Sequence, residues 1–144
     1  MQYGLAAWCL EFIGAKAPNA IKKAAKSKNT NVKSSAISAL EEHIRKTQDH
    51  EAIQLVESAI NDTAENVQIE AIKLVGKLYR IESLIPKLIL KLKNKNPDIR
   101  KACVLSLMQL NVKEAINPLK EILKIEENTN VREIIKLAIK KIDN

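Results

Sequence analysis

With 144 residues, of which 46% are hydrophobic and 28% charged, the chain is long enough for one domain with a continuous apolar core, and two domains are not expected. It has only three glycines and four prolines, which excludes a collagen-like or disordered chain. The net charge of +7 admits an acidic protein, nucleic acid or an anionic membrane as a partner and requires none of them.

Targeting signals and disulfides are not expected. No apolar run approaches the ~18 residues of a membrane span, and the first 16 residues lack the basic start of a signal peptide. A cytoplasmic location without membrane partners is the simplest expectation. Cys9 and Cys103 both fall on apolar helical stripes, so we expect two reduced core thiols.

Five apolar residues open strongly periodic segments at nearly regular intervals. We call these residues the anchors: Met1, Val32, Val67, Ile99 and Val131. They are separated by 31, 35, 32 and 32 residues, and apolar or small residues recur four and eight places after each of them. This spacing is typical of one face of a helix, so each anchor predicts a helix.

A second set of helices is predicted between the anchors. Its apolar residues stand at relative places 0, 1, 4 and 8, counted from Ala17, Ala52, Leu84 and Ala115. We therefore predict a single all-α domain over 1–144, consisting of a helix at 1–13 and helical hairpins at 17–46, 50–80, 82–111 and 113–142. One hairpin alone is too small to bury its apolar face, so neighbouring hairpins must stack.

The loops before the anchors carry helix-capping residues. Asparagine stands three places before three of the anchors and is expected to cap the helix there, as Asn29, Asn96 and Asn128. Before Val67, Asp62 or Thr63 must take this role. Pro97 fits the first position of a helix, where the missing amide needs no partner.

The anchor segments read NTNVKSSAISAL, AENVQIEAIKLV, NPDIRKACVLSL and NTNVREIIKLAI. They resemble the anchor-helix signature of HEAT repeats, especially the short class related to bilin-lyase repeats, and Pro86 and Pro118 also fit that pattern. The resemblance covers nearly the whole chain. It implies an α-solenoid, a right-handed superhelix of stacked antiparallel hairpins with about four repeats plus one N-terminal helix. The motif specifies a fold and implies no cofactor.

The chain departs from the family pattern at the residues that help to register neighbouring repeats. The family usually has an aspartate before the anchor and an arginine after it, and here only Asp98 and Arg100 match both. The other repeats combine asparagine with Lys33, Gln68 or Arg132. We therefore expect packing, and not an ionic ladder, to set the register.

The two ends of the repeat array differ in character. Lys136, Lys140 and Lys141 make the last helix polar on the side where a further repeat would stack, as a terminal cap requires. The first helix adds apolar surface, which predicts an N-terminal interface with a second copy, a partner or further repeats: Tyr3, Trp8, Leu10 and Phe12. Alternatively, Trp8 and Phe12 fold onto the first hairpin.

No catalytic or metal site is expected. His43 occupies a helix place that is apolar in the other repeats, so it is interpreted as a half-buried packing residue. His50 beside Glu51 supplies too few ligands for a metal. Trp8 and Glu11, one helical turn apart, resemble the pair in HEAT-like DNA glycosylases, but core or interface packing is favoured. An enzyme ranks below a binding protein.

In HEAT arrays the anchor helices line the concave side, so the resemblance implies a partner-binding face with Lys33, Gln68, Lys73, Arg100, Lys101 and Arg132. The leading hypothesis is a non-catalytic scaffold that holds an acidic or amphipathic protein segment. Nucleic-acid binding through basic blocks at 16–33 and 87–101 is the main alternative, although the acidic block at 41–70 interrupts such a track. An accessory or lyase-like subunit and a homodimer are further alternatives.

Overall fold

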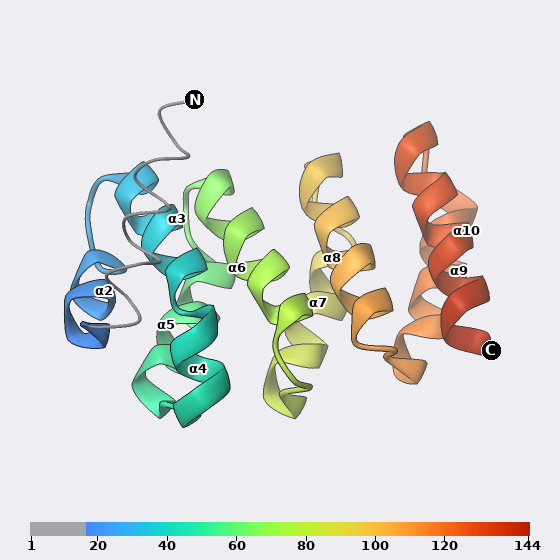
Figure 1. The fold of residues 1–144 in the computed structure, drawn as a ribbon. Helices are drawn as coiled ribbons and strands as arrows, with labels where there is room; N and C mark the ends of the chain where they lie inside the picture. The colour runs from blue at the N-terminus through green and yellow to red at the C-terminus, as the bar shows by residue number, and fades with distance from the viewer. Residues whose placement is uncertain (1–16) are drawn as a thin grey trace. The chain divides into compact units, whose positions relative to one another are not determined.

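The structure is a computed structural model that describes residues 17–144. Within this range all regular secondary structure is helical, which confirms the predicted all-α class (Figure 1). The chain divides into two compact units, Met1–Leu74 and Val75–Asn144. The predicted helix at 1–13, with the proposed interface of Tyr3, Trp8, Leu10 and Phe12, lies outside the described residues. The single domain over 1–144 stays a prediction.

The helices of the first unit are α2 (Pro18–Ala24), α3 (Thr30–Ala39), α4 (Glu41–Thr47), α5 (His50–Ile60) and most of α6 (Glu65–Lys77), whose last three residues belong to the second unit. Helix α3 packs against α2 and α5. One continuous helix was expected to follow the anchor Val32, but the structure divides it into α3 and α4 at Leu40. The amide of Leu40 bonds to the carbonyls of Ile37 and Ser38. Serine forms helices less readily than alanine or leucine, and Ser34, Ser35 and Ser38 all precede this break.

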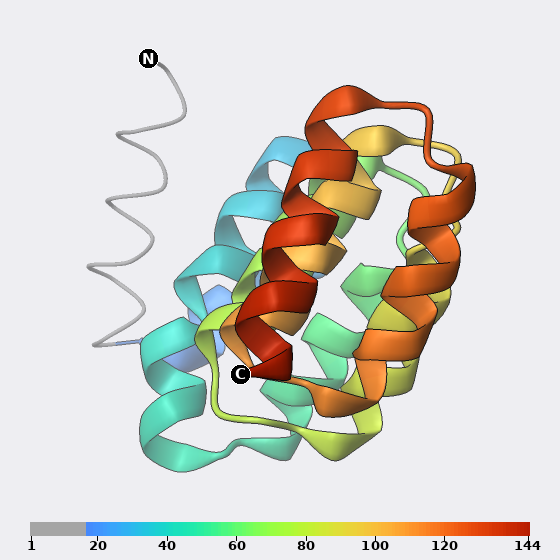
Figure 2. The ribbon, with the colours of Figure 1, turned by 90° about the vertical axis from the view of Figure 1, so that its right-hand side faces the viewer.

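The second unit contains two hairpins, each of which begins with a short 3-10 turn. Its elements are η1 (Glu82–Leu84), α7 (Ile85–Lys91), α8 (Pro97–Gln109), η2 (Lys113–Ala115), α9 (Ile116–Ile125) and α10 (Thr129–Asp143). Helix α10 packs against both α8 and α9, and it lies beside α8 in both views of the ribbon (Figures 1 and 2). No described helix is both long and apolar enough to cross a membrane.

The predicted apolar stripes form the core. The anchors Val67, Ile99 and Val131 are at most 2% exposed, and the residues four places after them are fully buried. Val32 differs, since 40% of it is exposed. Cys103 is a buried free thiol, as expected for a core position.

The three predicted asparagine caps are confirmed. Asn29 Oδ1 accepts hydrogen bonds from the amides of Asn31 and Val32 at 3.0 and 3.2 Å. Asn96 and Asn128 cap α8 and α10 in the same way, and Pro97 lies in the first turn of α8. Before α6, Asp62 Oδ1 accepts from the amide of Ala64 at 2.9 Å, which is a contact within the loop and not a cap of the helix, so the cap expected at Asp62 or Thr63 stays a prediction. The three asparagine side chains satisfy amides that a helix leaves without internal partners.

Candidate functional site: the anchor helices and their loops

The residue five places before each anchor organises the loop that leads into the anchor helix. In all four described loops its side chain accepts a hydrogen bond from the amide two residues later, at 2.9–3.1 Å. These loop residues are Ser27, Asp62, Asn94 and Glu126. Serine, aspartate, asparagine and glutamate share an acceptor oxygen but little else, so the common role was not visible in the sequence.

The residue after the anchor holds the same loop from the other side. Gln68 Nε2 donates to the carbonyl of Asp62 at 2.6 Å, and Arg100 Nη1 donates to the carbonyl of Asn94 at 2.9 Å. Arg132 Nη1 donates to the carbonyl of Glu126 at 2.7 Å and to that of Leu123 at 2.9 Å. Each side chain therefore satisfies carbonyls in the loop of its own repeat.

Two of the residues that directly follow an anchor, Lys33 and Arg100, also contact the loop of the next repeat. Lys33 Nζ forms an ion pair with Asp62, and Arg100 pairs with Glu126 through Nε and Nη2, both at 2.7 Å. The expectation that packing without an ionic ladder sets the register was therefore wrong. The acidic partners, Asp62 and Glu126, stand five places before the anchor of the next repeat, whereas the aspartate of the family pattern stands directly before an anchor. The hydrogen bonds from Arg100 lower the pKa of Glu126 below its ordinary value, although burial opposes this.

The six residues of the implied binding face are divided between the two units: Lys33, Gln68 and Lys73 belong to the first, and Arg100, Lys101 and Arg132 to the second. Lys33, Gln68, Arg100 and Arg132 are half-buried against the loops. Lys73 and Lys101 are exposed, and Lys73 Nζ lies 3.3 Å from Glu70 Oε1. The binding face itself stays a prediction, and internal bonds already engage five of its members.

A different set of places faces outward on the anchor helices. We call this set the stripe. It comprises the residue directly before each described anchor and the residues two, six and ten places after it, all of which are exposed or half-buried. In the first unit it borders a groove of about 390 Å³ lined by Asn31, Ser34, Ser35, Ser38, Asn66, Ile69 and Glu70. Ser38 Oγ donates to Glu70 Oε2 across this groove at 2.8 Å.

In the second unit the stripe combines leucines with lysines. On α8 it includes Lys101 and Leu105, and on α10 it includes Leu137 and Lys141. Leu137 is 54% exposed, which is unusual for a large apolar side chain in this structure. Neither lysine forms an ion pair with another described residue. The helical period of 3.6 places these positions on one side of each helix and could have identified them from the sequence.

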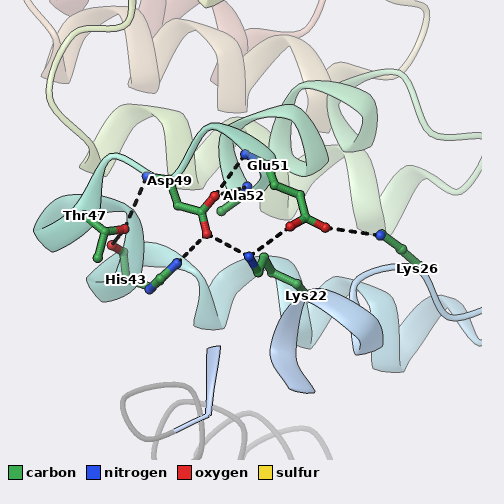
Figure 3. A network of polar contacts seen from close by, with 7 residues as sticks. All are labelled: Lys22, Lys26, His43, Thr47, Asp49, Glu51 and Ala52. Atoms are coloured by element: carbon green, nitrogen blue, oxygen red, sulfur yellow. Dashed lines mark hydrogen bonds and ion pairs between the residues drawn. The ribbon is translucent and has the colours of Figure 1, made fainter. Parts of the chain in front are cut away.

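A cluster of charged side chains joins α2, α4 and α5 in the first unit (Figure 3). Asp49 Oδ2 lies 2.7 Å from Nε2 of His43 and 2.9 Å from Nζ of Lys22. Lys22 also bonds to Glu51 at 3.0 Å, and Glu51 accepts from Lys26 at 3.4 Å. His43 is half-buried as expected, but it belongs to a polar network and is more than a packing residue.

The cluster has a clear structural purpose. Asp49 Oδ1 accepts from the amides of Glu51 and Ala52 and so caps α5. Hydrogen bonds from His43 and Lys22 hold the pKa of Asp49 well below its usual range. The hydrogen bond to Asp49 raises the pKa of Lys22, and that from Lys22 lowers the pKa of Glu51. The network therefore stabilises ionised groups at the junction of three helices.

Nucleophilic and metal chemistry finds no support among the residues that the structure describes. Burial raises the pKa of the Cys103 thiol to about 12, so this thiol stays protonated at neutral pH. No group of three or more histidine, cysteine, aspartate or glutamate side chains there could hold a metal ion. Trp8 and Glu11 lie outside the described part of the chain.

A family model described as HEAT repeats matches residues 54–140, which is more than half of the chain. The chain belongs to the HEAT-repeat family. This confirms the resemblance on which the fold was predicted, and it agrees with the repeated pairing of anchor helices and loops.

Two known proteins are similar to this HEAT-repeat chain. The bilin biosynthesis protein MpeU of Synechococcus sp. (strain WH8020) is 32% identical over 137 residues, which cover 95% of this chain and 46% of that protein. The chain thus spans about half the length of this relative. The structure of the complex of CpcE and CpcF of phycocyanin lyase from Nostoc sp. PCC7120 matches with a TM-score of 0.75 and 23% identity, covering 93% of this chain and 86% of the matched one. The second likeness confirms the HEAT-like helical-repeat fold.

Proposed function

We propose that this HEAT-repeat chain is a protein-binding module of a bilin lyase type of assembly and has no catalytic role of its own. The observation that carries the proposal is the 32% identity to a bilin biosynthesis protein over 95% of the chain. The fold neighbour supports a protein partner, because it comes from a complex of two proteins of a phycocyanin lyase. The accessory, lyase-like interpretation and the scaffold interpretation of the sequence thus describe one function.

The stripe of the second unit supports this role best. Leu105 and Leu137 supply apolar contacts between Lys101 on α8 and Lys141 on α10. An amphipathic segment with acidic flanks would bury the leucines and pair its carboxylates with the lysines. An apolar patch of several side chains that charged residues surround is typical of an interaction surface, whereas a single exposed apolar side chain is not.

The side chains of His43 and Cys103, residue types that often act in catalysis, have structural roles in this chain. The ring of His43 contacts the carboxylate that caps α5. Cys103 is fully buried, and its raised pKa keeps it a thiol. These observations favour a binding role over nucleophilic or acid–base catalysis.

The test is capture of the full chain's partners from the cells that produce it, with a stripe variant beside the wild type. The variant Lys101→Glu with Leu137→Asp reverses one charge and removes one apolar contact. We expect the wild type to retain a protein with the visible absorption of a bilin, or a second lyase-type repeat protein. The variant should retain at least about tenfold less, because central interface residues contribute on the order of 2 kcal/mol.

A matched control makes the same chemical changes elsewhere on the second unit. Lys93→Glu with Ile125→Asp alters one exposed lysine and one isoleucine that is 75% exposed. This control should retain as much partner as the wild type. Equal capture by all three proteins would contradict the stripe, and captured proteins without any bilin or lyase-type member would contradict the assignment to bilin handling.

A further inference from the structure

The anchor helices within one unit stack so that equivalent residues lie side by side. In the first unit Asn66 Nδ2 donates to Oδ1 of Asn31 at 3.4 Å, and both residues directly precede an anchor. The second unit stacks in the same way, because its ion pair between Arg100 and Glu126 joins the same relative places as the ion pair of the first unit. Helices α8 and α10 also lie side by side and run in the same direction (Figures 1 and 2).

This register sets the two leucines of the second unit's stripe beside each other and its two lysines at opposite ends. Leu105 and Leu137 both stand six places after their anchors, so they lie at one level of the helix pair. Lys101 stands two places after its anchor on α8, whereas Lys141 stands ten places after its anchor on α10. The lysines therefore mark a diagonal across the two helices, with the leucine pair at its centre.

The opposite diagonal carries no positive charge. Its ends are Gln109 on α8 and Glu133 on α10, which are both exposed. The hydrogen bond from Lys136 lowers the pKa of Glu133, so this carboxylate is ionised at neutral pH. Asp98 ends the stripe on α8 beyond Lys101. An acidic partner is therefore attracted along the diagonal of the lysines and not along the other one.

The stripe stays open where a further hairpin follows. Helix α8 is followed by the hairpin of α9 and α10, yet Lys101 is exposed and Leu105 is half-buried. Helix α3 is followed by α5 and α6, and its stripe residues Asn31, Ser34 and Ser38 are likewise exposed or half-buried. The stripe is thus accessible because of the side of the helix on which it lies, and a following repeat does not occupy it.

The length of the diagonal suits a helix. The two lysines differ by eight places along the helix pair, which is about 12 Å of rise, and neighbouring helix axes lie about 8–10 Å apart. Their Cα atoms are therefore separated by about 15 Å. A helix covers this distance in about eleven residues, or three turns, and presents the fourth and seventh places on the same side. An extended segment fits less well, because the anchor helices offer no backbone groups to pair with its own.

We propose that the stripe of the second unit binds a helix of the partner that crosses α8 and α10 along the diagonal of the lysines. Two acidic residues about eleven places apart on this helix pair with Lys101 and Lys141. Two apolar residues, four and seven places after the first acid, cover Leu105 and Leu137. This inference rests on the proposed function, since it takes the stripe as the surface that binds the partner, and it adds the residue pattern and the crossing direction of the segment.

The test selects helical peptides on the purified full chain. The peptides are displayed as a library that varies only at relative places 0, 4, 7 and 11, each occupied by glutamate, lysine, leucine or alanine. We expect selection of glutamate at both ends with leucine at both inner places. The matched peptide has the same residues in exchanged order, with leucine at the ends and glutamate inside. The expected pattern should be enriched at least about tenfold over it.

Charge reversal of each lysine identifies what the ends of the peptide contact. With Lys101→Glu or Lys141→Glu alone, we expect peptides with one glutamate end and one lysine end, because one end then meets a carboxylate. With both reversals, lysine should be selected at both ends. The control Lys120→Glu alters an exposed lysine of α9 outside the stripe and should leave the wild-type preference unchanged.

A variant of unchanged composition tests the diagonal itself. Glu133→Lys with Lys141→Glu exchanges two exposed residues of α10 and brings its lysine to the level of Lys101, where the helix axes lie only about 8–10 Å apart. The preference for glutamates eleven places apart should then fall at least about tenfold, while circular dichroism shows an unchanged helix content. A preference that survives this exchange, equal enrichment of the exchanged order, or no enrichment at all would overturn the proposal.

The diagonal helix and the proposed function can fail separately. The selection uses only the purified chain, so it does not depend on what the chain captures from cells. Captured proteins without a bilin or lyase-type member would contradict the proposed function and leave the diagonal helix supported by the selection. A failed selection beside a captured bilin protein would contradict only the diagonal helix.

Discussion

Arg100 and Glu126 form a bidentate ion pair in which Nε–Oε2 and Nη2–Oε1 are both 2.7 Å. Only 3% of the Glu126 side chain and 17% of the Arg100 side chain are exposed. Because Arg100 also bonds to carbonyls of its own loop, one guanidinium connects two successive loops of the second unit. The pair therefore ties neighbouring hairpins together at the ends of their anchor helices.

Loss of one partner of this pair should destabilise the second unit strongly. Replacing Arg100 by glutamine leaves the Glu126 carboxylate buried without its main donor, which costs about 3–5 kcal/mol in comparable buried pairs. Urea unfolding at neutral pH measures the free energy of unfolding. The double variant Arg100→Gln with Glu126→Gln should recover part of this loss, because no charge then remains buried.

The pair between Lys124 and Glu121 is the control for this prediction. Its side chains are 67% and 69% exposed, so its removal should change stability by at most about 1 kcal/mol. Equal effects of the two pairs would show that Arg100 and Glu126 do not connect the hairpins as the structure indicates.

Asp49 should make the first unit sensitive to acid. Hydrogen bonds from His43 and Lys22 keep its pKa in the folded state well below the ordinary value near 4. A lowered pKa contributes stability that is fully present above the unfolded value and is lost as the pH falls toward the folded value. Asp49→Asn retains a capping side chain but removes the charge. We expect it to lower stability by about 0.5–1 kcal/mol at pH 7 and to flatten the decline of stability below pH ~4.

Chemical denaturation at a series of pH values between 7 and 2 measures this effect. The control is Glu42→Gln, which removes an exposed carboxylate paired only with Lys46 one helical turn away. The free energy of unfolding of this control at pH 7 should stay close to that of the wild type. An Asp49→Asn protein with an unchanged acid profile would contradict the role of the cluster.

Cys103 should be inert in the folded chain. It is fully buried, and the raised pKa leaves almost no thiolate at neutral pH. In a Cys9→Ser background, an aromatic disulfide reagent should label Cys103 only on the timescale of unfolding and at once in denaturant. Rapid labelling of the folded protein would contradict its place in the core.

The periodic residues predicted most of the fold. Anchors spaced by about 32 residues, with small or apolar residues four and eight places later, located the helices because burial of one helical face depends only on that spacing. Asn29, Asn96 and Asn128 located the helix starts, since capping is a local interaction that a short sequence determines.

Contacts between repeats were much harder to predict. Lys33 and Arg100 were interpreted as free binding residues, although each pairs with an acid in the next loop, 29 or 26 residues away. The sequence does not specify which of several acidic residues such a side chain reaches, because that depends on how the hairpins stack. The cluster of Asp49, His43 and Lys22 was missed for the same reason, since its members come from three different helices.

Gly76 should be required at its place because the end of α6, which belongs to the second unit, approaches α8 closely there. A Cβ atom added to it would lie 2.9 Å from the Cα and 2.7 Å from the Oγ of Ser106, a residue that is 1% exposed. Gly76→Ala gains about 1 kcal/mol in helix propensity but overpacks this place at a cost of about 1–3 kcal/mol. We therefore expect a net loss of stability, measured as a lower Tm in thermal unfolding. Ser106→Ala in addition should recover only part of that loss, because the backbone of residue 106 would still be too close to the new methyl group. The neighbouring Lys77→Ala serves as the exposed control, and a Gly76→Ala protein with a raised Tm would show that the two helices separate without penalty.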